Sequence, residues 1–455
     1  MKENINLLEG PVLPNLTKLA LPIMATSLVQ MAYNMVDMIW IGRVSSGAVA
    51  AVGAAGMYMW LANGLSTLSK IGGQIKVGHS LGAKNVKEAK EYATSAVQLS
   101  IIYALLYTLV LLLFAKPFIH FLGLNGRTVI ADGITYLRIV SFGILFSFLN
   151  QVLTGLFTAM GNSRISFRAT AVGLVINMIL DPLFIYGYGP IPSLGVAGAA
   201  IATVLAQAVV TLLFVAACLK DETLFAGMRI LSKPNTKDMK EINKIGLPIS
   251  IQSMMFTGIS MILSRMVASF GDNAVAVQKV GSQIESISWM TAEGFSAAVN
   301  SFVAQNHGAK AFKRVKHGYH ISMAVVMAWG IFCTVVLIGF PEVIFKVFIP
   351  DESILNMGVS YLRILGFSQL FMCMEIATQG AFSGLGKTIP PSVVSITFTT
   401  ARIPMAFALS ATVLGLNGIW WSLTISSIIK GILLVGWFTI FLVRYEKRGC
   451  GALNR

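Results

Sequence analysis

Twelve long apolar stretches run through the chain, and they constrain its fold more than any other feature. A helix that crosses a bilayer needs about 20 mostly apolar residues. The stretches are long enough, and they lack the alternation of β-barrel strands. The sequence therefore predicts an all-α integral membrane protein with twelve transmembrane helices. These are expected at residues 16–40, 48–75, 92–115, 132–160, 166–189, 195–219, 244–270, 274–304, 318–348, 357–385, 389–413 and 416–443.

Charge is scarce and unevenly placed. Charged residues make up 12% of the chain, against about 25% in soluble domains, which excludes an ordinary soluble enzyme and a disordered chain. Of the 34 Lys and Arg residues, 21 fall in alternate connections or the C-terminal tail, and four fall on the opposite side. Lys and Arg concentrate on the cytoplasmic side of membrane proteins. The positive excess is therefore a topology signal that predicts cytoplasmic termini, with no nucleic-acid partner.

The most polar segment divides the twelve stretches into two groups of six. We expect an N-terminal lobe at 1–220, a cytoplasmic linker at 221–243 and a C-terminal lobe at 244–455. The halves share short sequences in the same order, which indicates a duplication. The matches include Leu21-Pro22-Ile23 with Leu247-Pro248-Ile249, Gly82-Ala83-Lys84 with Gly308-Ala309-Lys310, Tyr136-Leu137-Arg138-Ile139 with Tyr361-Leu362-Arg363-Ile364, and Pro182 with Pro404.

Each half has an even number of predicted spans, so both halves begin on the same side of the membrane. A pseudo-two-fold axis along the membrane normal is therefore expected to relate the two lobes. Duplicated helical bundles are typical of secondary transporters that work by alternating access. A membrane scaffold without transport activity is a further interpretation of the same pattern.

Five of the 19 acidic residues lie inside apolar stretches. A charge at the centre of a bilayer costs at least about 2.5–3.5 kcal/mol, so such residues mark function by default. They are Asp37, Asp181, Glu285, Glu293 and Glu375.

Two of these acids are expected at similar depth in the first lobe, namely Asp37 and Asp181. Asn177 precedes Asp181 by four residues and so shares its helix face. Pro182 lacks an N–H and leaves the Met178 carbonyl without its usual partner. Such an oxygen-lined spot suits a proton or a hard cation such as Na⁺. The alternatives are an internal hydrogen bond beside a kink for Asp181, and a helix-end position for Asp37.

The duplication makes Asn150 and Glu375 equivalent, because each lies five residues before a repeated glycine. Asn150 either completes the first-lobe cluster or only joins two helices. Glu375 is either a second-lobe cation or proton group, or a structural partner of Arg402. Glu285 and Glu293 are expected to line a cavity.

Enzyme signatures are missing from the sequence. The four cysteines have no metal-ligand spacing, and there is no nucleotide-binding motif. We expect a transporter without a cofactor, driven by H⁺ or Na⁺, and monomeric. Its partners are expected to be small organic cations and membrane lipid.

The chain resembles the multidrug and toxic compound extrusion (MATE) transporters over essentially its whole length. The motifs that carry the likeness are the Leu-Pro openings at Leu21 and Leu247, Gln305-Asn306-His307-Gly308-Ala309, Gly195-Val196-Ala197-Gly198-Ala199-Ala200 and Gly418-Ile419-Trp420. The resemblance implies a V-shaped pair of lobes. It also implies export of organic cations across a prokaryotic cell (inner) membrane, in exchange for inward-moving H⁺ or Na⁺.

Within that family, the Asp of the first helix and the Asn-x-x-x-Asp-Pro stretch resemble the prokaryotic DNA-damage-inducible branch. This likeness implies a cation site of Asp37, Asn177 and Asp181, with Asn150 nearby and Thr203 as a further oxygen donor.

The alternative in the same superfamily is a flippase for lipid-linked sugars. Those proteins usually have fourteen helices and a basic central cavity. In this chain the embedded basic residues are chiefly Arg265 and Arg402.

Overall fold

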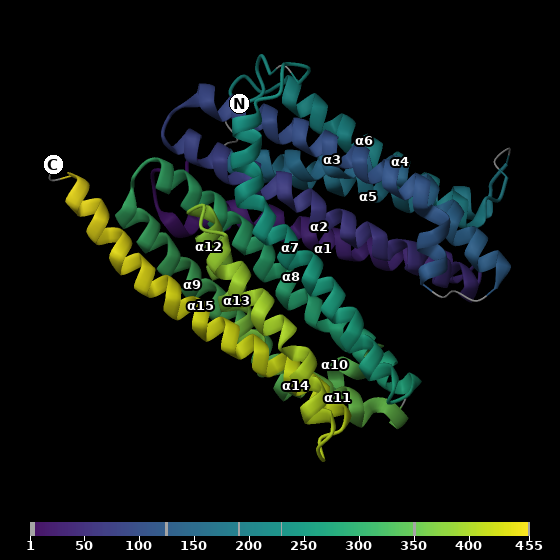
Figure 1. The fold of residues 1–455 in the computed structure, drawn as a ribbon. Helices are drawn as coiled ribbons and strands as arrows, with labels where there is room; N and C mark the ends of the chain where they lie inside the picture. The colour runs from purple at the N-terminus through teal and green to yellow at the C-terminus, as the bar shows by residue number, and fades with distance from the viewer. Residues whose placement is uncertain (1–4, 123–125, 190–191, 229, 349–351, 454–455) are drawn as a thin grey trace. The chain divides into compact units, whose positions relative to one another are not determined.

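The regular elements of the protein are α-helices (Figure 1). The structure, a computed structural model, describes residues 5–122, 126–189, 192–228, 230–348 and 352–453. The helices are α1 (Val12–Gly42), α2 (Ser46–Gly82), α3 (Val86–Phe121), α4 (Arg127–Ala159), α5 (Ser163–Tyr186), α6 (Gly195–Leu219), α7 (Thr236–Ala268), α8 (Asp272–Gly308), α9 (Phe312–Gly339), α10 (Pro341–Phe348), α11 (Glu352–Gly366), α12 (Gln369–Gly384), α13 (Ile389–Thr400), α14 (Arg402–Ser410) and α15 (Leu416–Leu453).

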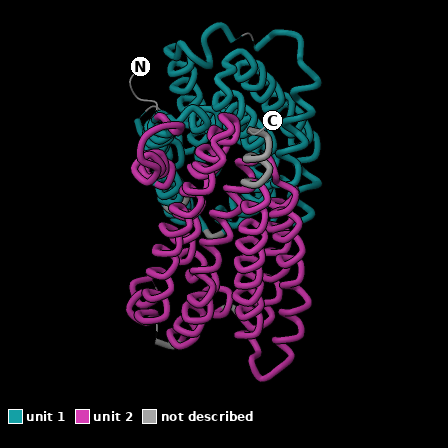
Figure 2. Tube along the Cα trace, turned by 90° about the vertical axis from the view of Figure 1, so that its left-hand side faces the viewer, with its two compact units in different colours: residues 1–5, 25–250 teal, residues 6–24, 251–455 magenta. Residues whose placement is uncertain are grey.

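The chain forms two compact units, shown in two colours in Figure 2. Unit 1 contains Ala25–Ser250 together with the start of the chain, and unit 2 contains Asn6–Met24 and Ile251–Arg455. The boundaries between the units therefore fall inside α1 and α7. The lobe and linker boundaries expected from the sequence, at 220 and 244, stay predictions.

The two units repeat one packing scheme. In unit 1, α4 packs against α2, α3 and α6, and in unit 2, α12 packs against α8, α9 and α15. These helices occupy the same places in the two sequence repeats. The packing therefore supports the duplication read from the sequence.

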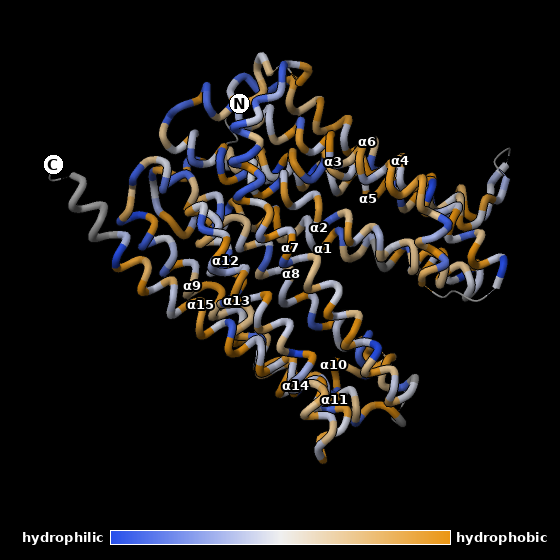
Figure 3. Tube along the Cα trace, in the orientation of Figure 1, coloured by the Kyte–Doolittle hydropathy of each residue, from blue (hydrophilic) through white to orange (hydrophobic). Residues whose placement is uncertain are grey.

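Most of the helices are long and apolar enough to cross a membrane. Among the described residues ten helices meet this condition when α13 and α14 are taken together as Ile389–Ser410, and the bent pair of α11 and α12 makes an eleventh span if it is counted as one. Apolar residues extend along the helices of both units (Figure 3). The remaining expected span is α8, which has polar side chains such as Lys279, Glu285 and Glu293 in its middle part. The predicted all-helical membrane fold is confirmed.

Three expected spans are interrupted in unit 2. In the stretch 318–348, α9 ends at Gly339 and a new helix, α10, starts at Pro341. The break lies at Phe340 because a proline disfavours the helical conformation of the residue before it. The stretch 357–385 bends by 46° between α11 and α12. The stretch 389–413 divides at Ala401 into α13 and α14. Pro404 has no N–H for the Thr400 carbonyl, which explains this last break.

A close helix crossing in unit 1 depends on a glycine. A Cβ atom at Gly246 of α7 would lie 2.1 Å from the Leu68 carbonyl oxygen of α2. One turn further along α7, the Ser250 hydroxyl donates a hydrogen bond to the Gly64 carbonyl at 2.7 Å. Small residues allow helix backbones to approach this closely inside a membrane.

We therefore expect Gly246→Ala to destabilise the protein by about 1–3 kcal/mol, the usual cost of overpacking. Gly258 on the same helix has no atom within 4 Å of the position of a Cβ, so Gly258→Ala is the matched control. Unfolding of the purified protein in detergent, followed by tryptophan fluorescence, measures both. Equal stability of the two variants would contradict the close crossing.

Candidate functional site

Two buried carboxyl groups meet inside unit 1. Asp37 on α1 is 9% exposed and Asp181 on α5 is fully buried. They are close enough to interact directly. The Asn177 side chain, one turn before Asp181, donates its Nδ2 hydrogen to Asp181 Oδ1 at 3.2 Å. The structure therefore brings together the three residues that the sequence placed at a first-lobe cation site.

Each carboxyl group keeps one oxygen without a partner. Oδ1 of Asp37 and Oδ2 of Asp181 are buried, and neither accepts a hydrogen bond from a described residue. A buried polar atom without a partner costs free energy, and the cost is larger if the group is charged. A proton or a small cation between these oxygens would remove that cost.

Hydroxyl groups extend this cluster. The Tyr33 hydroxyl lies 3.2 Å from the Thr203 hydroxyl, and Tyr136 also contacts Thr203. Both tyrosines lie within electrostatic range of Asp37 and Asp181. Thr203 therefore contacts the two tyrosines that border the acid cluster, and its role as a further oxygen donor stays a prediction.

Neither tyrosine was predicted from the sequence. Tyr33 precedes Asp37 by four residues, so the shared helix face could have revealed it. Tyr136 is on α4, and no local spacing connects it with the acids.

Asn150 is near this region but has other partners. Its Nδ2 donates to Gln207 Oε1 at 2.9 Å and to the Gln207 carbonyl at 3.1 Å. Its Oδ1 accepts from the Thr211 hydroxyl at 2.8 Å. Because its donor and acceptor groups both face α6, Asn150 joins α4 to α6, and no hydrogen bond links it to Asp37 or Asp181.

The second unit has an apolar cluster at the equivalent positions. The sequence repeat pairs Asp37 with Leu263, Asp181 with Ile403 and Thr203 with Leu423. Leu263 is buried in a hydrophobic cluster against which Ile403 and Leu423 pack. The oxygen-lined arrangement of unit 1 is therefore not repeated in unit 2.

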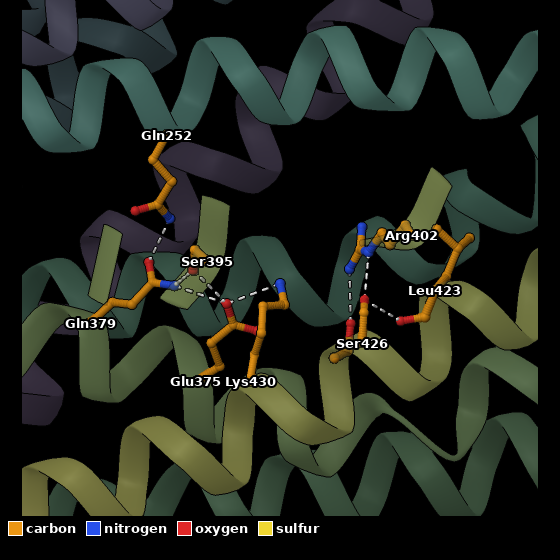
Figure 4. Close-up of polar contacts among 9 residues, drawn as sticks. Gln252, Glu375, Gln379, Ser395, Arg402, Leu423, Ser426 and Lys430 are labelled. Atoms are coloured by element: carbon orange, nitrogen blue, oxygen red, sulfur yellow. Dashed lines mark hydrogen bonds and ion pairs between the residues drawn. The ribbon is translucent and has the colours of Figure 1, made fainter. Parts of the chain in front are cut away.

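Unit 2 has a different buried polar network, centred on Glu375 of α12 (Figure 4). Glu375 Oε1 lies 3.0 Å from Lys430 Nζ of α15. The same oxygen accepts hydrogen bonds from Gln379 at 2.9 Å and from the Ser395 hydroxyl at 3.0 Å. Gln379 Oε1 also accepts a hydrogen bond from Gln252 Nε2 of α7 at 3.2 Å. The network thereby connects α7, α12, α13 and α15.

The sequence left Glu375 as either a cation or proton group or a structural partner of Arg402, and the geometry gives it a different direct partner. Glu375 forms its ion pair with Lys430, whereas Arg402 donates to the hydroxyls of Ser426 at 2.6 Å and Ser427 at 3.0 Å. Lys430 was not predicted from the sequence, where Arg265 and Arg402 are the chief embedded basic residues. Its position inside the apolar stretch 416–443 could have identified it.

The other two embedded acids, Glu285 and Glu293, belong to unit 2. Glu285 is half-buried on α8 and accepts a hydrogen bond from Gln369 at 3.2 Å. Glu293 is exposed on the same helix. Within the described ranges, no group of three or more His, Cys, Asp and Glu residues could hold a metal ion.

A duplicated bundle of membrane-length helices with an acidic cluster in one repeat is typical of a secondary membrane transporter. The MatE family model matches residues 22–183 and again residues 248–408. The chain therefore belongs to the MatE family. The two matches lie at the same spacing as the short repeats in the sequence, which supports the duplication.

Named relatives extend over nearly the whole chain. It is 27% identical to the probable multidrug resistance protein NorM of Thermotoga maritima, over 95% of this chain and 93% of that protein. It is 24% identical to the multidrug export protein MepA of Staphylococcus aureus, over 92% and 91%. A crystal structure of a MATE protein in the bent conformation has the same fold, with a TM-score of 0.91, 23% identity and 99% coverage of both chains.

The Glu375–Lys430 pair gives a stability prediction. Removing one partner of a buried pair leaves an uncompensated charge, so Lys430→Met is expected to cost about 3–5 kcal/mol. The double variant Glu375→Gln with Lys430→Met removes both charges and should recover most of that loss. Denaturant unfolding in detergent completes the cycle. Additive losses in the double variant would show that the pair is not coupled.

Proposed function

We propose that this protein exports organic cations in exchange for H⁺ or Na⁺ by alternating access. The coupling ion would bind in unit 1 at Asp37, Asn177 and Asp181, with Thr203 as a further oxygen donor. Family membership and the names of the relatives support drug export. The buried acid cluster supports ion coupling.

One observation carries the ion site, namely the two buried carboxylate oxygens without hydrogen-bond partners, on Asp37 and Asp181. Two carboxyl groups in contact cannot easily both carry a charge. A shared proton would neutralise one of them, and Na⁺ would balance the pair through oxygen ligands. The cluster is therefore suited to binding a cation, because the cation would reduce the repulsion between the two carboxyl groups.

Ion binding and drug binding would then oppose one another. A cluster with free negative charge attracts a cationic substrate, whereas a cluster that holds H⁺ or Na⁺ attracts it less. Loading of the ion on the outer side would release the drug there. Unloading of the ion on the cytoplasmic side would restore the affinity for the drug. Thermodynamic reciprocity requires that the drug weaken ion binding by the same factor.

The asymmetry between the units supports a single ion site. The equivalents of Asp37, Asp181 and Thr203 in unit 2 are leucine and isoleucine in an apolar cluster. The acid of unit 2, Glu375, already has Lys430 as a fixed positive partner. We therefore assign the coupling ion to unit 1.

The excess of Lys and Arg on one side of the predicted spans supports cytoplasmic termini. We further propose that the protein is a monomer in a prokaryotic inner membrane.

We expect Asp37→Asn and Asp181→Asn each to reduce gradient-driven export of a dye cation at least about tenfold. Each variant removes a charge on which ion binding depends, worth about 1.4 kcal/mol or more. The measurement is ethidium movement in proteoliposomes under an imposed pH or Na⁺ gradient. Glu91→Gln, at an exposed acid on α3 of the same unit, is the matched control and should leave export unchanged.

The same assay identifies the ion. Export that follows a pH gradient in Na⁺-free buffer would assign H⁺, and export that needs Na⁺ at constant pH would assign Na⁺. Undiminished export by both Asp variants would refute the proposed ion site. If no cation is exported by the unmodified protein while a labelled lipid-linked sugar is flipped, the flippase interpretation replaces drug export.

A further inference from the structure

Unit 2 buries two positive side chains next to one another. Arg402 at the start of α14 is 7% exposed and Lys430 on α15 is 5% exposed. They lie within electrostatic range of each other. Placing two like charges in a membrane-embedded bundle is unfavourable unless negative charge compensates them.

The resident acids compensate only one of the two cations directly. Lys430 has Glu375 at 3.0 Å. Arg402 has no carboxylate within ion-pair distance among the described residues, and its hydrogen bonds go to two neutral serine hydroxyls. Glu375 and Glu285 act on Arg402 only at longer range. The guanidinium is therefore held in place by hydroxyls and has no direct counter-charge.

Arg402 also keeps unused donors. Its Nε and Nη2 donate to Ser426 and Ser427, and Nη1 donates to no described residue. A guanidinium presents its N–H groups in a planar fork that fits a carboxylate. The serines and Lys430 are three or four residues apart on α15, so they share one helix face with the contact to Arg402. Figure 4 shows Arg402 and Lys430 reaching toward one another beside this face.

An aromatic ring completes the surroundings. The Arg402 guanidinium lies 5.9 Å from the centre of the Phe256 ring on α7, and Phe256 is half exposed. A ligand that meets both groups would need an anionic end for the guanidinium and a flat apolar body for the phenyl ring.

We propose that Arg402, with Lys430 beside it, binds the carboxylate of an amphipathic aromatic substrate. This inference rests on the proposed export function, and it names the residue that would recognise a carboxylate group on a substrate. The carboxylate would supply the counter-charge that Arg402 lacks. Glu375 would stay on Lys430, so that the unit gains one negative charge with the ligand.

Two dyes that differ in a single group test this proposal, namely rhodamine B, which has a free carboxylate, and its ethyl ester. Binding is measured at equilibrium by fluorescence anisotropy of the purified full chain in detergent, without an ion gradient. Arg402→Gln is expected to weaken rhodamine B binding by about tenfold or more, with the affinity for the ester nearly unchanged. Arg402→Lys keeps the charge but loses the fork, so it should give a smaller loss.

The matched control is Arg265→Gln, at an exposed arginine on α7 of the same unit, which should leave both affinities unchanged. An equal loss of both dyes in Arg402→Gln and Arg402→Lys would show a structural role and overturn the proposal. Unchanged rhodamine B binding would also overturn it, while ester export under a gradient would still support the proposed function. If the ester binds the unmodified protein and rhodamine B does not, the carboxylate assignment fails, whereas the export function is judged by the ethidium assay.

A competition arm separates carboxylate from phosphate chemistry. Benzoate is expected to displace rhodamine B from the unmodified protein, and to do so less effectively from Arg402→Gln. If geranyl diphosphate displaces the dye at far lower concentration than benzoate, the site is a diphosphate site. That result would overturn the carboxylate assignment in favour of a lipid diphosphate.

Discussion

The cost of an uncompensated charge inside hydrocarbon determines the chemistry of this protein. A bundle of membrane-length helices has little water with which to satisfy polar atoms, so each embedded acid needs a partner within the bundle or a ligand. Glu375 meets this need with Lys430 and two further donors. Asp37 and Asp181 do not, because each keeps a buried oxygen without a hydrogen-bond partner. Glu375 and Lys430 therefore belong to a structural network, whereas Asp37 and Asp181 are suited to an exchangeable ion.

The two polar arrangements, the acid cluster of unit 1 and the Glu375 network of unit 2, occur in units that share one arrangement of helices. The central helices α4 and α12 pack against equivalent neighbours in their own units, so the scaffold was retained after the duplication. The polar residues were not retained. Where unit 1 has Asp37, Asp181 and Thr203, unit 2 has an apolar cluster. Where unit 1 has the neutral Asn150, unit 2 has the charged Glu375. The units thus share a fold and differ in the chemistry of their interiors.

This division between the units would suit the proposed exchange of substrate for an ion. If both units bound the coupling ion, two ions would have to be loaded and released in every cycle. In the proposed mechanism Lys430 neutralises Glu375 and the coupling ion binds only in unit 1, so unit 2 is available to recognise the carboxylate of a substrate. Arg402, which lacks a direct counter-charge, and the neighbouring Phe256 are then the groups proposed to set substrate specificity. The two proposed sites can be tested separately, since each lies within its own unit.

The sequence by itself determined the membrane class, the duplication, the family resemblance and the positions of the acids that matter. Apolar length and local i, i+4 spacing are encoded along the chain, so Asn177 and Asp181 could be paired without a structure. Only the tertiary structure decided which distant residues meet. Tyr136 lies within electrostatic range of the two acids. Glu375 forms its ion pair with Lys430 and not with Arg402, and Asn150 forms its side-chain hydrogen bonds with α6. The breaks at α11–α12 and α13–α14 also appeared only there. Contacts between helices depend on their rotation and depth, and no local spacing records these.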